Sequence, residues 1–481
     1  MTRQPENPPI ATRNELTREL RSHASFRDSS GFVFYRDGVL LRQINASYQD
    51  DYRHLLQSGL WQKLVEGGHL VGHHEVNEPP FDANVDPFVV VAPERVPFVS
   101  YPYEWSFSQL KDAALATLDI QLAALDHDMS LKDASAFNFT FRDCRPVFID
   151  TLSFERYIEG KPWPAYRQFC EHFLGPLALM GKVDIRLGLL SQLRVEGVPL
   201  DFVSRLLPLR TWLSWPLLAN IHLHARSQKR HSGGGKAAKT SIKVSKFNLI
   251  AMLHGLRKTV TDLSWKVAGT EWRDYYANTT YSVNASDSKA SIVAEYLNAV
   301  APKTVWDIGA NTGQFSRLAV QQGRDVIAFD VDPSAVELNY LEAKARGETR
   351  ILPLLLDVTN PSPGIGWAHQ ERSRLIDRAD ADALLALALV HHLAIANNIP
   401  LELIASYFAR LSPTLIIEYV PKSDSQVKHM LASREDIFSD YTQEGFEAAF
   451  ARSFTIEHRS TVDRSERIIY LMRAKAKSVE S

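Results

Sequence analysis

A single acidic residue comes just before a glycine-rich turn in the second half of the chain. The apolar run TVWD ends at Asp307, and the turn that follows contains Gly309, Asn311 and Gly313. A dinucleotide cofactor is held by the spacing G-x-G-x-x-G, with no anion beside its pyrophosphate. The third glycine of that spacing is absent here, and the carboxylate of Asp307 would repel a pyrophosphate. Asn311 can replace a glycine, because asparagine adopts positive φ more readily than most residues.

The polarity of the turn suits a ligand of the opposite charge. S-adenosylmethionine carries an ammonium group, a sulfonium group and one carboxylate. A carboxylate ahead of the turn can accept hydrogen bonds from the ammonium group. Backbone N–H groups at the start of the next helix can bind the ligand's carboxylate. We therefore expect Asp307 to precede the glycines because the nearest group of the ligand is positive.

The elements around the turn alternate between strand and helix. Apolar runs predict strands, and proline and glycine mark the helix ends. This alternation predicts an α/β domain with a mostly parallel sheet, whose ligands bind beyond the carboxyl ends of the strands. Strands are expected over 304–309, 325–332, 350–357, 381–390 and 414–420, helices over 291–300, 314–323, 333–347 and 401–411, and a closing pair of strands in FTIEHRS and RIIYLMR.

The turn resembles the motif D/E-x-G-x-G-x-G of class I methyltransferases, with asparagine at the middle glycine. The resemblance covers roughly residues 270–475 and implies a Rossmann-like fold and S-adenosylmethionine as cofactor. In that family an acid after the second strand binds the ribose hydroxyls, which corresponds to Asp330 in AFDVDP. A side chain after the third strand reaches the adenine amine, which corresponds to Asp357 in LLLDV. The alternatives are a helix cap for Asp330 and a loop acid for Asp357.

Two further groups are candidates for the reaction. In many class I enzymes an aromatic segment upstream of the turn covers the cofactor, and Tyr281 in TEWRDYYANTTYS is the candidate here, with a plain core aromatic as the alternative. After the fourth strand, VHHLAIANN replaces the Asn/Asp-Pro-Pro-aromatic turn typical of amide and base methylation. His391 or His392 could remove a proton from a hydroxyl acceptor, since histidine titrates near neutral pH. No metal-ligand spacing is evident in this half.

The N-terminal half contains a second polar set in LKDASAFNFTFRDCRPVFID (131–150). Asp133 and Asn138 are five residues apart, and Asp150 ends the second strand of a hairpin. Protein-kinase-like and aminoglycoside-kinase-like folds place a base Asp, a metal-binding Asn and a metal-binding Asp in this order. The resemblance implies an α+β kinase-like domain and Mg-ATP. The usual lysine of the third strand is not evident, and Arg42 is the candidate substitute. The alternatives are a degenerate site or ordinary turn residues.

Composition places the chain among soluble globular proteins of more than one domain. Its 481 residues are 45% apolar, with a formal net charge of −2, which gives no reason to expect a specific nucleic-acid partner. Two cysteines in no metal or disulfide spacing and a polar N-terminus predict a cytoplasmic protein. The Trp-rich stretch 206–225 is interrupted by Arg210 and two prolines, so it is expected to be a core helix or helix pair, with an interfacial helix as the alternative.

A basic, glycine-containing stretch over 225–246 divides the chain. Its composition predicts a linker between two domains, and the alternative is that it contacts an acidic partner. We expect a polar N-terminal segment (1–24), a kinase-like α+β domain (25–224), this linker (225–246) and a class I methyltransferase domain (247–481). The whole chain resembles a bacterial family that includes a rhizobial host-specific nodulation protein, which implies a role in symbiosis and leaves the methyl acceptor unknown. The alternatives are a phosphotransferase and an inactive regulatory binding protein.

Overall fold

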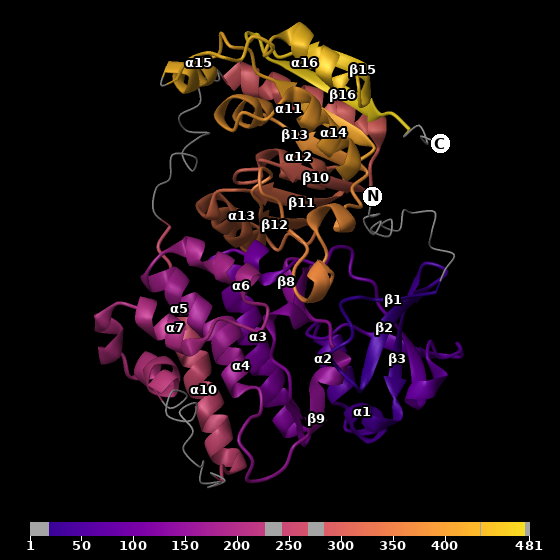
Figure 1. The fold of residues 1–481 in the computed structure, drawn as a ribbon, viewed down its shortest axis with the longest axis vertical. Helices are drawn as coiled ribbons and strands as arrows, with labels where there is room; N and C mark the ends of the chain where they lie inside the picture. Colours follow the sequence, from indigo (N-terminus) through magenta and orange to yellow (C-terminus); the bar gives the residue numbers. More distant parts are fainter. Residues whose placement is uncertain (1–18, 227–242, 268–282, 433, 477–481) are drawn as a thin grey trace, which may run out of the picture.

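The computed structural model describes residues 19–226, 243–267, 283–432 and 434–476. The chain forms two masses stacked along its long axis, with the N-terminal half below the C-terminal half (Figure 1). Tyr281 and most of the basic stretch lie outside the described residues. Within the described ranges, no group of three or more His, Cys, Asp or Glu side chains is arranged to hold a metal ion, and no helix has the length and apolar character needed to span a bilayer.

A seven-stranded sheet forms the centre of the C-terminal half, in the order β12-β11-β10-β13-β14-β16-β15. Its first five strands are parallel, and β16 runs antiparallel to both of its neighbours. The order of the parallel strands is that of a doubly wound Rossmann sheet, which confirms the expected mostly parallel α/β fold. The strands are β10 (Thr304–Ile308), β11 (Asp325–Asp330), β12 (Ile351–Leu355), β13 (Ala383–Ala386), β14 (Thr414–Tyr419), β15 (Phe454–Thr461) and β16 (Ile468–Ala474).

Helices cover both faces of this sheet (Figure 1). α11 and α12 pack on one face with buried residues of the central strands, and Arg317 of α12 contacts Asn339 and Glu342 of the neighbouring helix α13. The buried residues of α14 and α16 belong to the main core. Proline begins α13 and a glycine with φ of 65° ends it, as the sequence predicts. The helices are α11 (Val283–Val300), α12 (Gln314–Gln321), α13 (Pro333–Arg346), α14 (Leu401–Leu411), α15 (Ser425–Ala432) and α16 (Gln443–Phe450).

The N-terminal half begins with an antiparallel five-stranded sheet in the order β1-β2-β3-β5-β4. The expected hairpin turns at Asp37 and Gly38, whose φ angles of 49° and 79° suit a tight turn between twisted strands. The short strand β1 extends this sheet, although the sequence placed it in the polar N-terminal segment. The elements are β1 (Leu20–Arg21), β2 (Gly31–Arg36), β3 (Val39–Asn45), α1 (Gln49–Gln57), α2 (Leu60–Glu66), β4 (His73–Val76) and β5 (Pro87–Pro93).

A helical part follows, built around the long buried helix α3 (Phe107–Asp126). Two small strand pairs, β6 with β9 and β7 with β8, lie beside it. These elements give the half the expected α+β character. The remaining elements are β6 (Met129–Leu131), β7 (Phe139–Arg142), β8 (Arg145–Phe148), β9 (Phe154–Arg156), α4 (Tyr166–Phe169), α5 (Gly175–Lys182), α6 (Leu190–Leu193), α7 (Leu200–Leu206), α8 (Trp215–Leu217) and α10 (Lys246–Asp262).

Helix α10 packs against α3, so it belongs with the N-terminal half. Arg257 on α10 forms an ion pair with Asp119 on α3, with 2.7 Å between Nε and Oδ1. Lys111 donates to the carbonyl oxygens of Thr261 and Leu263 at the end of α10. The sequence boundary at residue 247 placed this helix in the C-terminal domain. Its apolar residues find their buried partners on the other side of that boundary.

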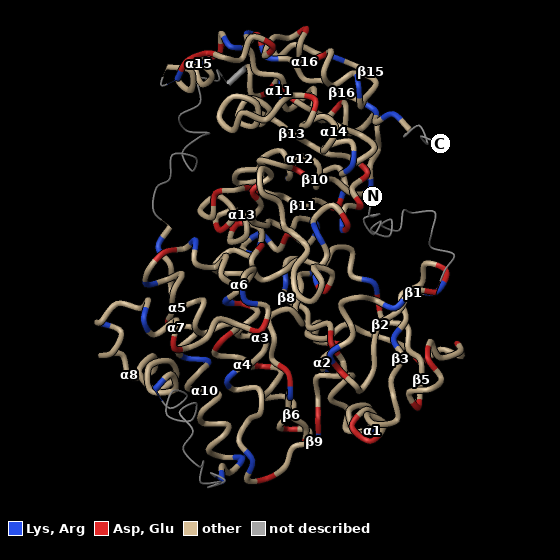
Figure 2. Tube along the Cα trace, in the orientation of Figure 1, with Lys and Arg blue, Asp and Glu red and all other residues tan. Residues whose placement is uncertain are grey.

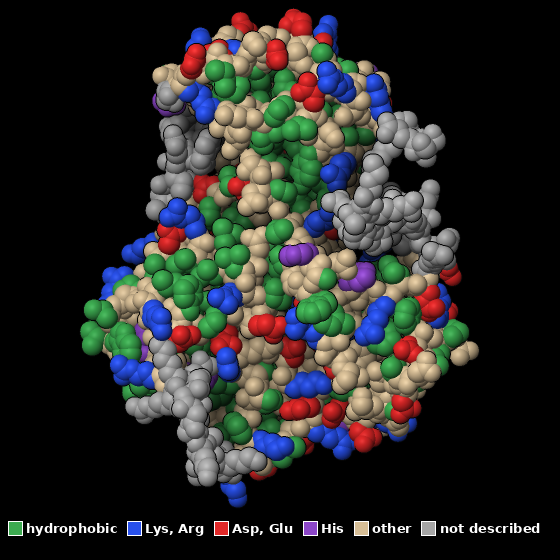
Figure 3. All heavy atoms as spheres, in the orientation of Figure 1, with side chains coloured by type: hydrophobic (Ala, Val, Ile, Leu, Met, Phe, Trp, Pro, Cys, Tyr) green, Lys and Arg blue, Asp and Glu red, His purple; other side chains and the backbone are tan. Residues whose placement is uncertain are grey.

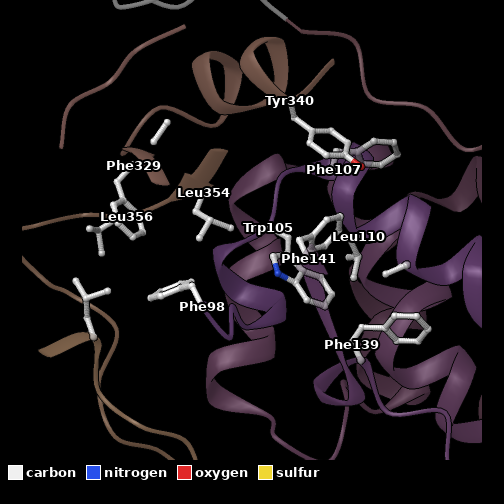
Figure 4. Close-up of a cluster of buried hydrophobic side chains, with 14 of the residues drawn as sticks. Phe98, Trp105, Phe107, Leu110, Phe139, Phe141, Phe329, Tyr340, Leu354 and Leu356 are labelled. Carbon is white, nitrogen blue, oxygen red and sulfur yellow. The ribbon is translucent and has the colours of Figure 1, made fainter. Parts of the chain in front are cut away.

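The two halves share one hydrophobic core. Figure 4 shows this cluster, in which Phe98 from the N-terminal half faces the C-terminal sheet. The ring of Phe98 packs edge-on against Trp306 and Phe329, with centroids 5.6 Å and 6.2 Å apart. Tyr340 of α13 packs in the same manner against Phe141. Apolar surface of both halves is therefore removed from water at one interface.

Polar contacts between the two halves lie beside this shared core. Glu337 of α13 accepts hydrogen bonds from the backbone N–H and the hydroxyl of Ser108, in the first turn of α3. A carboxylate at a helix N-terminus is stabilised by the unpaired N–H groups there. Glu104 is paired with Arg378 and accepts a 2.6 Å hydrogen bond from Ser362. The interface is thus fixed by specific charges as well as by apolar contact.

Candidate functional site

The glycine-rich turn joins β10 to α12 at the carboxyl edge of the sheet. Gly309, Asn311 and Gly313 have φ angles of 79°, 49° and 85°. Asn311 therefore adopts the left-handed conformation that the sequence required of it. The N–H groups of Gly309 and Ala310 both donate to the carbonyl of Phe329 on β11. These bonds hold the turn against the next strand.

Asp307 is buried at the end of β10, with 2% of its surface exposed. Its Oδ2 accepts a 2.7 Å hydrogen bond from the hydroxyl of Ser316 on α12. Burial raises the pKa of Asp307 to about 6, and the nearby charge of Asp330 acts in the same direction. The hydrogen bond from Ser316 and the charge of Lys289 oppose this rise.

Asp330 ends β11 and closes the turn from the other side. Its Oδ2 accepts a 2.7 Å hydrogen bond from the N–H of Asn311, and its Oδ1 accepts from the N–H of Asp332. Burial raises the pKa of Asp330 to about 6, against the effect of these backbone bonds. The capping role that was the alternative for Asp330 belongs to Asp332, which accepts from Ser334 at the start of α13. A carboxylate has about four acceptor positions, so Asp330 can still accept further hydrogen bonds.

Asp357 lies in the loop after β12 and is exposed. Its Oδ1 accepts hydrogen bonds from the N–H and the hydroxyl of Thr359. This is a local turn of the kind aspartate commonly forms. The structure thus places Asp307 before the turn, Asn311 in it and Asp330 against it, and places Asp357 in the loop after the neighbouring strand β12.

A buried charged network lies beside the turn, centred on Glu418 at the end of β14. Lys289 of α11 donates to Glu418 Oε2 at 2.6 Å, and Arg467 lies 3.4 Å from its Oε1. Arg467 also pairs with Asp424 at 2.8 Å. Glu418 Oε2 accepts a further 2.7 Å bond from the N–H of Ala388, whose φ is 50°. The network therefore fixes the backbone that leaves β13.

His391 and His392 follow this strained segment, at the start of a π-helical turn over His392–Ala396. Their ring centroids are 4.2 Å apart. His391 has no exposed surface, and both of its ring nitrogens lack a hydrogen-bond partner. Burial, followed by the charges of His392 and Arg467, lowers the pKa of His391 well below its usual value. Burial lowers the pKa of His392 to about 4.

These pKa values differ from the near-neutral value assumed from sequence. Both imidazoles are neutral at pH 7, so each can accept a hydrogen bond and each is a weak base. Leu389, just before the pair, lies 3.5 Å from the position that a Cβ on Gly309 would take. This contact places the start of the histidine segment against the glycine-rich turn.

The N-terminal polar set converges at the junction of the β-sheet and the helical part. Arg42 of β3 pairs with Asp150, with 2.7 Å between Nη1 and Oδ1. Ser153 donates a 2.5 Å hydrogen bond to Asp150, and Asn138 donates a longer one of 3.4 Å to Ser153. Burial acts to raise the pKa of Asp150, but Arg42 and Ser153 outweigh it and the net shift is downward.

Asp133 faces the same junction. Its Oδ1 accepts a 2.8 Å bond from the N–H of Ser135. Burial raises the pKa of Asp133, the charge of Asp150 adds to this, and hydrogen bonds from Ser135 and Asn138 oppose it. The four residues chosen from the sequence are therefore connected through Asp150, which pairs with Arg42, interacts with Asp133 and reaches Asn138 through Ser153.

Comparison with known proteins assigns the chain to a family. No protein-family model matches the sequence. A nodulation protein of Rhizobium meliloti strain 1021, NoeA, is 37% identical over 458 residues, which cover 94% of this chain and 95% of the relative. The chain belongs to the NoeA family.

Solved structures resemble part of this member of the NoeA family. Magnesium protoporphyrin IX methyltransferase from Synechocystis PCC 6803, with bound SAH, is 15% identical, covers 42% of this chain and 93% of its own, and has a TM-score of 0.31. A protein from Pyrococcus horikoshii OT3 is 17% identical over 43% of this chain and all of its own, with a TM-score of 0.29. These scores are too low to carry an argument, so the site is interpreted from its own geometry.

Sequence patterns missed several residues of this site. Lys289 was missed, because its partner Glu418 is 129 positions away and no local spacing connects the two. Ser316, which holds Asp307, is one of many serines, with no signal of its own. Lys132 is a second cation at the N-terminal junction, where its Nζ lies 3.4 Å from Ser30 Oγ and 4.9 Å from the ring centre of Tyr48. Its position next to Asp133 was the one available signal.

Proposed function

We propose that this chain is an S-adenosylmethionine-dependent methyltransferase that acts on an oxygen or nitrogen of a small molecule or protein. One observation carries the proposal: Asp307 and Asp330 are buried at neighbouring strand ends on either side of a turn with left-handed backbone. Each carboxylate has its pKa raised. Asp330 accepts from the N–H of Asn311 in the turn, and Asp307 accepts from Ser316 on the helix that follows the turn. Such a pair favours a cationic ligand and disfavours a pyrophosphate.

The donor and acceptor groups of the site fit that cofactor. Asp307 would accept from its ammonium group, and Asp330 would accept from the ribose hydroxyls. Bound S-adenosylmethionine supplies a methyl group from its sulfonium centre. Asp357 is the proposed adenine contact and Tyr281 the proposed cover over the cofactor. The chain's own contribution is to hold these charges in place and to align the acceptor, since transfer from a sulfonium needs mainly proximity and orientation.

We propose His391 and His392 as the residues that meet the acceptor. Buried polar atoms nearly always have a hydrogen-bond partner, so the two unpaired nitrogens of His391 require an explanation. A hydroxyl or amine of the acceptor would supply one. The low pKa values keep both rings neutral at physiological pH, so their first role would be to orient the acceptor's N–H or O–H.

The biological setting comes from the family. The relative is named as a nodulation protein, and its name states no activity. We propose that the methyl transfer serves a bacterial pathway linked to nodulation and takes place in the cytoplasm. The basic stretch that begins at residue 225 could bind an acidic partner in that pathway.

Calorimetric titration with S-adenosylhomocysteine tests the cofactor proposal. We expect the wild-type protein to bind it and to show no binding of NAD. Asp307→Asn should weaken binding about tenfold or more, because the hydrogen bond to the ligand's ammonium group is no longer strengthened by a negative charge. Asp325→Asn is the matched control, since Asp325 begins β11 at the opposite edge of the sheet and pairs with Arg350 on the surface.

Three results would contradict the cofactor proposal. The first is binding of NAD without binding of S-adenosylhomocysteine. The second is unchanged affinity in Asp307→Asn. The third is equal loss in Asp307→Asn and Asp325→Asn, because an effect unrelated to the turn would then explain both.

A nucleotide site in the N-terminal half is the second candidate function. The observation in its favour is the convergence of Arg42, Asp133, Asn138 and Asp150 with the additional cation Lys132. Two cations can neutralise nucleotide phosphates, while Asn138 and Asp150 offer the oxygen ligands that Mg²⁺ prefers. On this proposal the half is kinase-like and either transfers phosphate or holds nucleotide as a regulatory domain.

Titration with Mg-ATP separates these possibilities. Binding by the wild-type protein that is lost in Asp150→Ala supports a nucleotide site. Transfer of phosphate in a radiolabelled assay would then distinguish an active kinase from a binding domain. Absence of binding by the wild-type protein would reject the nucleotide proposal.

A further inference from the structure

One stretch of the chain, residues 202–261, contains no acidic residue. It carries eleven Lys and Arg, although the whole chain has a formal net charge of −2. The stretch starts in α7, passes through α8 and ends in α10, and α10 packs beside α8. Figure 2 shows Lys and Arg in blue on the trace around α8 and α10. Among the residues of this stretch that the structure describes, Arg205, Lys246, Arg257 and Lys258 pair with acidic residues. Arg210 and Arg226 are exposed, and they supply positive charge beside the apolar residues described next.

Large apolar side chains project from the same elements. Leu209, Leu213 and Trp215 are 85%, 90% and 71% exposed, and Phe247 at the start of α10 is 80% exposed. Figure 3 shows hydrophobic side chains gathered at the edge of the molecule near α7 and α8. The sequence predicted a core helix or helix pair over 206–225, with an interfacial helix as the alternative. The structure instead breaks the segment into short helices and directs these residues outward.

The apolar residues are accompanied by exposed basic side chains. Arg205 and Arg210 lie between and beside the projecting leucines, and Arg226 stacks over the ring of Trp212, 4.5 Å from its centre. Apolar side chains with Trp and a basic rim are the composition of segments that insert shallowly into the headgroup region of a bilayer. Lys and Arg add attraction to anionic lipids.

We propose that the surface formed by α7, α8 and the 3₁₀ turn Leu209–Leu213 binds an anionic lipid bilayer. The leucine and tryptophan side chains enter the interfacial region, and Arg205 and Arg210 contact lipid phosphates. Nucleic acid fits less well, since phosphate contacts do not require projecting aliphatic groups. Charge complementarity with anionic headgroups together with exposed apolar area favours the bilayer over a purely acidic protein surface. This proposal does not depend on methyl transfer.

Flotation of the full-length protein with vesicles tests the proposal. One set of vesicles contains phosphatidylcholine alone, and the other contains phosphatidylcholine mixed with phosphatidylglycerol. We expect the protein to float with the anionic vesicles, to a smaller extent as salt is raised, and to remain unbound with the neutral ones. The double variant Leu209→Ser/Leu213→Ser should reduce the partition coefficient about tenfold or more, because apolar area no longer leaves water.

Two variants separate the apolar contribution from the charge contribution. Arg210→Glu should lower binding to anionic vesicles and leave the apolar residues in place. Leu403→Ser on α14 is the apolar control, since Leu403 is 62% exposed and lies outside the stretch. Lys63→Glu on α2 is the charge control. Equal melting temperatures for all variants would show that the substitutions act on the surface and not on folding.

Several outcomes would overturn the proposal. Failure of the wild-type protein to float, or equal flotation with neutral and anionic vesicles, would do so. Equal losses in the controls and in the surface variants would do so as well. A concentration-dependent dimer that the double serine variant abolishes would show that a second copy covers the surface. Binding to polyglutamate or to duplex DNA without vesicle binding would show an acidic partner instead.

Discussion

Asp307 and Asp330 meet at the turn as two carboxylates in a buried position. Burial raises the pKa of each to about 6, so part of the population is protonated at mildly acidic pH. A cation placed between them would favour the charged form of both. The same groups that select the ligand's charge thus make its binding sensitive to pH.

We predict that the affinity for S-adenosylhomocysteine falls as pH is lowered through about 6. The sign follows from the raised pKa values: above pH 6 the carboxylates are charged and accept hydrogen bonds, and below it they are protonated. Calorimetry above and below pH 6, repeated in buffers of different ionisation enthalpy, should also show proton release on binding near that pH. An affinity that stays constant over this range would show that neither carboxylate contacts the ligand.

At the scale of elements, the β10–α12 turn depends on two glycines for different reasons. A Cβ on Gly309 would lie 3.5 Å from Leu389, which is an ordinary van der Waals distance. Glycine is therefore favoured at position 309 only by its positive φ. A Cβ on Gly313 would lie 2.6 Å from the side-chain oxygen of Asn339 and 2.8 Å from Arg317, in addition to requiring positive φ.

We therefore predict that Gly313→Ala destabilises the protein more than Gly309→Ala. Positive φ alone costs about 1–2 kcal/mol for alanine, and crowding at Gly313 adds to this. Urea unfolding of both variants provides the comparison, and Gly323→Ala is the control because Gly323 has positive φ and no neighbour within 4 Å. Equal destabilisation by all three would mean that the turn relaxes to accept the side chain.

Glu418 joins three elements, since it pairs with Lys289 of α11 and Arg467 ahead of β16 and holds the backbone after β13. We predict that Glu418→Gln lowers the free energy of unfolding by about 3–5 kcal/mol, because buried Lys289 loses its counter-charge and buried Arg467 keeps only Asp424. Glu457→Gln is the control on exposed β15, where its pair with Arg473 should be worth less than about 1 kcal/mol. A loss below 1 kcal/mol in Glu418→Gln would show that the cations find other partners.

At the scale of the whole molecule, the shared core makes the two halves one folding unit. We predict that Arg378→Met destabilises both halves together by about 3–5 kcal/mol, because it leaves Glu104 buried without its counter-charge. Calorimetry should show a single transition that moves to lower temperature. Arg95→Met is the control, since the Arg95–Asp380 pair crosses the same interface in an exposed position. Two transitions, with only one displaced, would show independent halves.

The sequence predicted what local patterns determine. The strands and helices around β10 follow from hydrophobic periodicity and from proline and glycine at helix ends, and the turn residues from their backbone preferences. The sequence did not predict features that depend on contacts between residues far apart in the chain. The alignment of Lys289 with Glu418, the docking of α10 on α3 and the outward direction of Leu213 depend on partners that no short window contains. The lowered pKa of His391 is likewise a consequence of burial, which residue type alone does not reveal.

The interface has a consequence for the edge of the C-terminal sheet. β12 is an outermost strand, and such strands offer unpaired backbone groups to other chains. Pro353 removes one N–H from that strand, and its carbonyl accepts a 3.0 Å hydrogen bond from the side chain of Gln109 at the start of α3. The N-terminal half thus shields this edge from strand addition. Separating the halves would expose the backbone of β12 to pairing with strands of other chains. The N-terminal half is therefore expected to protect the sheet from aggregation.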